Sequence, residues 1–203
     1  SWLGVNDWGV AAAVLNRHGS LGPAPGQRSR GELVLEALDH PDAVAAAEAL
    51  AHLDPAAYRT FNLIVADNRD AFWLRHAEGA RIAVNPIPEG LSLIDSGELN
   101  RPNNRRVALA APRFRDAAPP DPDRDDWAAW EHLLSDGESP AGEPPENALR
   151  FAMPHGYGTV SSALIALPQP NAGERMPRFR YAQWQPAPIP WADIAVRASP
   201  SPR

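Results

Sequence analysis

The first residue that could do chemistry is Ser1, at the head of the run SWLGVND. If a processing step exposed it, Ser1 would carry both a hydroxyl and a free α-amino group. That pair is the minimum for an N-terminal nucleophile, in which the amine is the base that activates the hydroxyl. Otherwise Ser1 is an interior residue of a longer chain. The sequence pattern identifies no other catalytic residue, so the catalytic set is unknown unless Ser1 is processed.

Two arginines stand at the start of a predicted helix. Arg28 and Arg30 belong to the run RSRGELV, and cations are disfavoured near the positive end of a helix dipole. This conflict indicates an anionic partner, either a buried carboxylate or the carboxylate or phosphate of a ligand. Glu32, one turn into the helix, is a candidate partner of Arg28 or of Ser29, the predicted N-cap.

Amides and hydroxyls at the ends of predicted strands complete the candidate set. Asn6 and Asn16 end adjacent strands, where their amides either line the mouth of a pocket or only support a left-handed turn. Thr159 and Ser161 present their hydroxyls on one face of a late strand. The predicted ligand-binding residues are therefore Asn6, Asn16, Arg28, Arg30, Thr159 and Ser161.

Composition and charge exclude several classes of partner. The net charge is −6 over 203 residues, but residues 116–147 hold ten acidic residues and one arginine, so the rest of the chain is weakly positive. No basic stripe of the kind that neutralises phosphates is present, no apolar run reaches the length of a membrane span, and no histidine pair has metal-ligand spacing. We therefore expect a small-molecule ligand, no nucleic acid, no membrane span and no metal; the oligomeric state is left open. The absence of cysteine fits a reducing compartment, and we expect a cytoplasmic protein.

Strands and helices are predicted in blocks, which favours an α+β architecture of helices on antiparallel sheets. Proline- and glycine-rich loops separate the blocks. A single domain is expected over residues 1–186, with an acidic, proline-rich insertion at about 116–147 and a proline-rich tail, 187–203, that frays. The predicted strands are 2–7, 10–16, 62–67, 70–76, 80–88, an edge strand at 90–93, 158–168 and 178–186. The predicted helices are 29–38, 42–53, 104–115 (kinked or ended by Pro112) and 127–134, and the 42–53 helix turns Val44, Ala47, Leu50 and Leu53 to one face.

Four runs in order resemble the NRDE family, also called the transport and Golgi organisation family. They are WLGVN at 2–6, RSRGELV at 28–34, FNLIVAD at 61–67 and YGTVSSALIAL at 157–167, and the resemblance extends over roughly residues 1–185. It implies an N-terminal-nucleophile-hydrolase-like αββα sandwich, in which two antiparallel sheets stack between helix layers. Family members begin with Met-Cys and a strand carrying Asn-Arg-Asp-Glu, which would lie upstream of Ser1. The resemblance therefore implies that the first strand is missing and that Ser1 marks a break rather than a nucleophile.

The same resemblance implies two functions. The favoured one is binding or handling of an apolar anionic metabolite, haem or a lipid such as acyl-coenzyme A, with haem as a ligand rather than a certain cofactor. The alternative is an amidohydrolase that cleaves a non-peptide C–N bond with the upstream cysteine. The run Asn68-Arg69-Asp70 does not substitute for the missing motif, because Ala71 replaces its glutamate.

Overall fold

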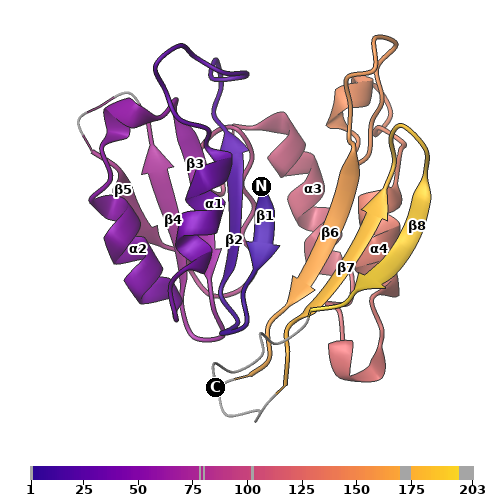
Figure 1. Ribbon diagram of the computed structural model, residues 1–203. Helices are drawn as coiled ribbons and strands as arrows, with labels where there is room; N and C mark the ends of the chain where they lie inside the picture. The colour runs from indigo at the N-terminus through magenta and orange to yellow at the C-terminus, as the bar shows by residue number, and fades with distance from the viewer. Residues whose placement is uncertain (1, 78, 80, 102, 170–174, 197–203) are drawn as a thin grey trace. The chain divides into compact units, whose positions relative to one another are not determined.

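The computed structural model describes residues 2–77, 79, 81–101, 103–169 and 175–196 (Figure 1). The described residues form two compact units, and each unit is considered by itself; the single domain expected from the sequence stays a prediction. The described residues of unit 1 fall within 1–99, 167–177 and 196–203, and those of unit 2 fall within 100–166 and 178–195.

Unit 1 contains a five-stranded antiparallel sheet whose strands follow one another in chain order (Figure 1). The strands predicted at 2–7, 10–16, 62–67 and 70–76 are confirmed as its first four strands. Between the first two strands, Gly9 adopts a φ of 85°, a conformation that glycine adopts without strain. The strands are β1 (Leu3–Val5), β2 (Ala11–Asn16), β3 (Phe61–Ala66), β4 (Ala71–His76) and β5 (Ala83–Pro86).

Two helices cover one face of this sheet, α1 (Gly31–Leu38) and α2 (Ala43–Ala51), and a short 3-10 helix, η1 (Pro55–Ala57), leads into β3. Alternate residues of the strands point to the helices, as the period of two requires. Leu63 and Leu74 on the strands are fully buried against Leu33 on α1 and Leu50 on α2. This apolar layer is the core of unit 1.

Three local predictions in unit 1 are wrong. Residues 90–93 form no strand. The N-cap of α1 is Arg30 rather than Ser29, whose hydroxyl accepts only a 3.3 Å hydrogen bond from the amide of Gly31. Val44 is 39% exposed because α2 starts at its Asp42 cap and turns its alanines inward.

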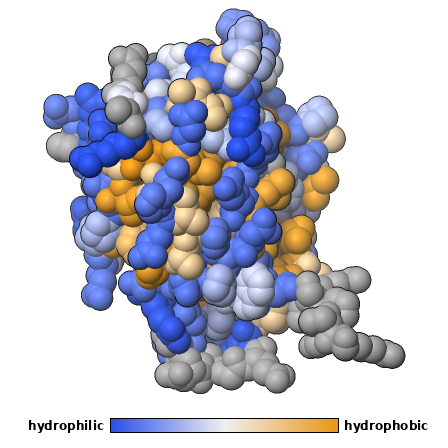
Figure 2. All heavy atoms as spheres, turned by 60° about the vertical axis from the view of Figure 1, so that its left-hand side comes forward, coloured by the Kyte–Doolittle hydropathy of each residue, from blue (hydrophilic) through white to orange (hydrophobic). Residues whose placement is uncertain are grey.

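Figure 2 shows apolar residues gathered among hydrophilic ones on the side of unit 1 that carries α2 and β5.

Asp67 connects the β3–β4 turn to the start of α2. One carboxylate oxygen accepts from the amide of Ala43 at 2.8 Å, and the other accepts from the amides of Arg69 and Asp70 at 2.7 and 2.9 Å. Burial alone would raise the pKa of Asp67, but these three hydrogen bonds outweigh it and hold the pKa below its usual value. The ionised carboxylate therefore stabilises the folded state.

We expect Asp67→Ala to lower the free energy of unfolding by about 1–2 kcal/mol at pH 7, because the amides at the helix start lose their acceptor. Since folding lowers the pKa of Asp67, its contribution is fully present above the ordinary value of about 3.9 and disappears as the pH falls through the lower folded-state pKa. Urea unfolding of both proteins between pH 7 and pH 2.5 checks this. Asp39→Ala, at an exposed position, is the control, and a difference that persists unchanged at pH 2.5 would contradict the assignment.

Unit 2 contains a three-stranded antiparallel sheet of β6 (Ser161–Ala166), β7 (Arg178–Gln183) and β8 (Ile189–Ile194). Its helices are α3 (Arg105–Asp116) and α4 (Ala128–Ser135), with 3-10 turns η2 (Pro122–Arg124) and η3 (Pro145–Asn147). α4 is joined to the sheet by an ion pair between Arg180 and Glu131 (2.6 Å) and by a hydrogen bond that the Trp191 indole donates to Ser135 Oγ (2.9 Å).

The predicted strands at 158–168 and 178–186 are confirmed as β6 and β7, which pair with each other, and the two predicted helices are confirmed as α3 and α4. Pro112 does not end α3, which continues to Asp116. The prediction of a fraying tail is wrong for residues 189–194, which form β8 by pairing with β7; residues 197–203 lie outside the described part.

The α+β class with two antiparallel sheets and four α-helices is confirmed for the described residues, while the sandwich stacking and the missing first strand stay predictions. No helix in the described ranges is long and apolar enough to cross a membrane.

Candidate functional site

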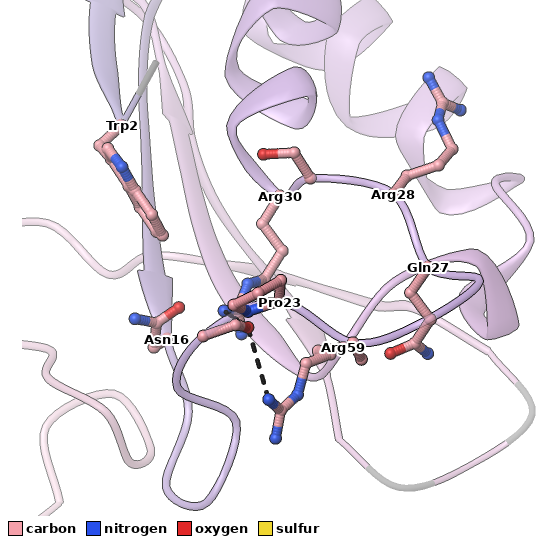
Figure 3. A pocket seen from close by; sticks show the side chains of 10 residues that line it. Trp2, Asn16, Pro23, Gln27, Arg28, Arg30 and Arg59 are labelled. Carbon is pink, nitrogen blue, oxygen red and sulfur yellow. Dashed lines mark hydrogen bonds between the residues drawn. The ribbon is translucent and has the colours of Figure 1, made fainter.

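Three of the predicted residues, Asn16, Arg28 and Arg30, meet at one cavity of unit 1, with a volume of about 410 Å³. It lies where β2 ends and α1 begins. Figure 3 shows Trp2, which directly precedes β1, across from Arg30, with Asn16 at the end of the neighbouring strand β2. The other lining residues are Trp2, Gly22, Pro23, Ala24, Gln27, Ser29 and Arg59.

Arg30 is buried, with 6% of its surface exposed, and all of its hydrogen-bond partners are neutral. Its Nη1 donates to Ser20 Oγ (2.8 Å) and to the carbonyl of Thr60 (3.0 Å), and its Nη2 donates to the carbonyl of Gly22 (3.5 Å). Among the described residues, no carboxylate forms an ion pair with Arg30. The site thus contains a buried cation that no carboxylate in the described part of the chain neutralises.

Arg59 adds a second cation, which the sequence analysis missed. Its Nη1 donates to the carbonyls of Leu21 (2.6 Å) and Gly22 (3.4 Å), and its Nη2 donates to that of Gly19 (2.7 Å). Burial lowers the pKa of Arg30, and the nearby charge of Arg59 lowers it further. No sequence motif marked Arg59. Its position follows from the β2–β3 register, in which Asn16 pairs with Phe61 and the residues before Phe61 lie beside the loop that follows Asn16.

Arg28 differs from Arg30, although both were predicted for the same reason. It is exposed, forms an ion pair with Glu32 (2.7 Å) and lies over the ring of Tyr58 (5.3 Å to the centroid). The hydrogen bond to Glu32 raises the pKa of Arg28. In Figure 3 its guanidinium points away from Trp2 and Asn16. The predicted Arg28–Glu32 pair is confirmed, and Arg28 already has an anionic partner.

The remaining predicted residues lie elsewhere. The Asn6 amide donates to the carbonyls of Leu38 and His40 (both 2.9 Å) and accepts from the amides of Trp8 and Val10, so it fixes the β1–β2 turn to the end of α1. Thr159 and Ser161 belong to unit 2, where Thr159 Oγ1 accepts from the amide of Phe151 (3.2 Å). Ligand roles for these three residues stay predictions, and Ser1 lies outside the described residues.

A second cavity of unit 1, of about 660 Å³, shares Gln27 and Arg59 with the first. Its wall includes Tyr58 and His76, which are almost fully buried. Burial lowers the pKa of His76, the charge of Arg17 acts in the same direction, and the backbone of Tyr58 acts in the opposite direction. Within the described ranges, no group of three His, Asp or Glu side chains is arranged to hold a metal ion.

The fold and the cavity together define an α+β protein with an arginine-lined cavity beside an antiparallel sheet. Residues 1–89 match the family described as Transport and Golgi organisation 2. This match confirms, over that part of the chain, the resemblance seen in the sequence, and it includes every residue that lines the first cavity. No curated protein is similar enough to the chain to count as a match.

Proposed function

We propose that the first cavity binds a small molecule that combines an anionic group with an apolar part. The observation that carries this proposal is the pair Arg30 and Arg59 in a cavity wall that contains no acidic side chain among the described lining residues. Taking a guanidinium out of water without a counter-charge is unfavourable by several kcal/mol. An anionic ligand would supply the missing charge.

Donors for such a ligand remain on both arginines. A guanidinium has five N–H groups, and no hydrogen bond found among the described residues uses Nε of Arg30 or of Arg59. Their Nη groups are already fixed by backbone carbonyls, so less side-chain entropy is lost on binding. Carboxylates and phosphates suit these donors because they accept two parallel hydrogen bonds.

The apolar part of the ligand has a surface to contact. Trp2, Pro23 and Ala24 line the same cavity, and the Trp2 side chain is 53% exposed. A volume of about 410 Å³ lies within the range of small-molecule sites. Haem and acyl-coenzyme A, the ligands that the family resemblance suggests, both combine an apolar body with carboxylates or phosphates, and they are our two candidates.

We expect Arg59→Gln to weaken binding of haem or of octanoyl-coenzyme A about tenfold, because one charged hydrogen bond to the anion is lost. Isothermal titration of the wild type and the variant with both compounds measures this. Arg81→Gln is the matched control, since Arg81 is exposed and lies outside the cavity.

Neutral analogues separate charge recognition from apolar adsorption. Haem dimethyl ester and octanoyl-N-acetylcysteamine keep the apolar bodies but lack the anionic groups, so we expect both to bind weakly and equally to the wild type and to Arg59→Gln. The proposal would be wrong if neither haem nor octanoyl-coenzyme A bound the wild type. It would also be wrong if the wild type, Arg59→Gln and Arg81→Gln bound these compounds equally.

A further inference from the structure

We infer that Ser20 is a positioning residue of this anion site: its hydroxyl determines where the Arg30 guanidinium lies. The inference rests on the proposed function and goes beyond it, because Ser20 is not among the residues that line the first cavity. Ser20 acts on the ligand through Arg30, and it does so from a loop that no sequence pattern singled out.

The Ser20 hydroxyl is buried and fully used. The residue is 3% exposed. Its oxygen accepts from Arg30 Nη1 (2.8 Å) and from the amide of Arg17 (3.0 Å), while its hydrogen has two acceptors in reach, the carbonyls of Arg17 (2.7 Å) and Thr60 (2.9 Å). A hydroxyl offers one donor and two acceptor sites. The donor and both acceptor sites of the hydroxyl therefore have partners within the protein.

Arg30 depends on this hydroxyl because its other acceptors are few. The carbonyl of Thr60 lies at 3.0 Å and already has the Ser20 hydroxyl within reach, and the carbonyl of Gly22 lies at 3.5 Å, beyond a good hydrogen bond. Without Ser20 Oγ, one well-formed hydrogen bond would hold a side chain with several rotatable bonds. The guanidinium would then sample several positions in the cavity wall.

The neighbours of Ser20 hold the second arginine in the same manner. Arg59 donates to the carbonyls of Gly19, Leu21 and Gly22, so residues 19–22 form a clasp on both guanidiniums. Gly19 and Gly22 adopt φ values of 74° and 81°, which other residues adopt only with strain. The clasp orders the two cations before a ligand arrives, which is the general way in which preorganisation raises affinity.

A double-mutant cycle tests the inference with haem and octanoyl-coenzyme A as probes. We expect Ser20→Ala to weaken binding of the probe about tenfold when Arg30 is present, which corresponds to one hydrogen bond to a charged group. In an Arg30→Met background the same substitution should change binding by less than about twofold, because the side chain that Ser20 positions is gone.

A merely structural serine would give a different pattern. Equal loss of affinity in both backgrounds, or no loss with Arg30 present, would overturn the inference while leaving the proposed function standing. If the wild type binds neither probe, or if Arg30→Met and Arg59→Gln bind like the wild type, the proposed function itself fails.

Two further variants serve as controls for an effect on folding. Ser96→Ala removes another serine hydroxyl of unit 1, which lies 3.1 Å from His18 Nε2, and should leave both affinities unchanged. If Ser20→Ala does not fold, Ser20→Cys keeps the side-chain size but weakens the hydrogen bonds. It is then expected to show the same dependence on Arg30, and the absence of that dependence would count against the positioning role.

Discussion

Replacing Asn62 with alanine is expected to lower the free energy of unfolding of unit 1 by about 3–4 kcal/mol, the largest effect that we foresee for a single polar side chain. Asn62 lies in β3 on the face of the sheet that does not carry α1 and α2, and it is fully buried. Its amide connects two strands to a segment that has no regular secondary structure.

Four hydrogen bonds produce this effect. The Asn62 oxygen accepts from Arg17 Nη1 (2.7 Å) and from the Trp73 indole (3.1 Å), and its nitrogen donates to the carbonyls of Asp95 (2.9 Å) and Gly97 (2.7 Å). Alanine would leave the Trp73 N–H without this partner in a buried position and would detach the segment around Gly97 from the sheet. Unmade hydrogen bonds of this kind cost more than the formed ones contribute.

Urea unfolding followed by circular dichroism measures the change, with hydrogen exchange of the β3 amides identifying the transition of unit 1. Asn68→Ala is the matched control because Asn68 is exposed in the β3–β4 turn, and we expect it to change the unfolding free energy by less than about 0.5 kcal/mol. Equal effects of the two substitutions would show that the Asn62 network does not stabilise the sheet.

The elements of unit 1 were predictable because their signals are local. Asp42 caps α2 and Gly9 makes the first turn, and each acts within a few residues of itself. β8 was missed because a proline-rich run resembles a loop, and only its pairing with β7 makes it a strand. Where pairing with a neighbouring strand decides the structure, local propensity is a weak guide.

The candidate site was predictable only in part, for the same reason. A helix start with two arginines indicated an anionic partner. The sequence could not show that Arg28 meets Glu32, whereas Arg30 is buried and forms no ion pair with a carboxylate that the structure describes. Arg59 and Ser20 escaped notice because their contacts join segments that are 10 to 40 residues apart. Such contacts depend on strand register, which motifs do not reveal.

Arg30→Met is expected to weaken binding of haem and octanoyl-coenzyme A at least about thirtyfold while leaving the free energy of unfolding unchanged or higher. The loss of affinity follows from removing the buried charge that faces the anion, which corresponds to about 2 kcal/mol. The free energy of unfolding is not expected to fall, because replacing a buried charge with an apolar side chain of similar size is often neutral or stabilising.

The neighbours of Arg30 allow this substitution. Ser20 Oγ keeps its hydrogen bond from the amide of Arg17, and the carbonyl of Thr60 keeps the Ser20 hydroxyl within reach. The carbonyl of Gly22 loses only a long contact from Arg30, and Arg59 already donates a hydrogen bond to the same carbonyl. Methionine is unbranched and flexible, so it can fill the space along the path of the arginine side chain.

Arg180→Met provides the contrast. Arg180 forms an ion pair with Glu131 at 2.6 Å, and both side chains are largely buried, at 16% and 19% exposure. Removing the cation there leaves a carboxylate without its partner, so we expect a loss of about 2 kcal/mol in unfolding free energy and no change in the affinity for either probe. Urea unfolding and titration of both variants distinguish the two arginines. An Arg30→Met protein as destabilised as Arg180→Met would mean that Arg30 serves the fold, whereas stable folding with lost affinity means that its buried charge is maintained for a ligand.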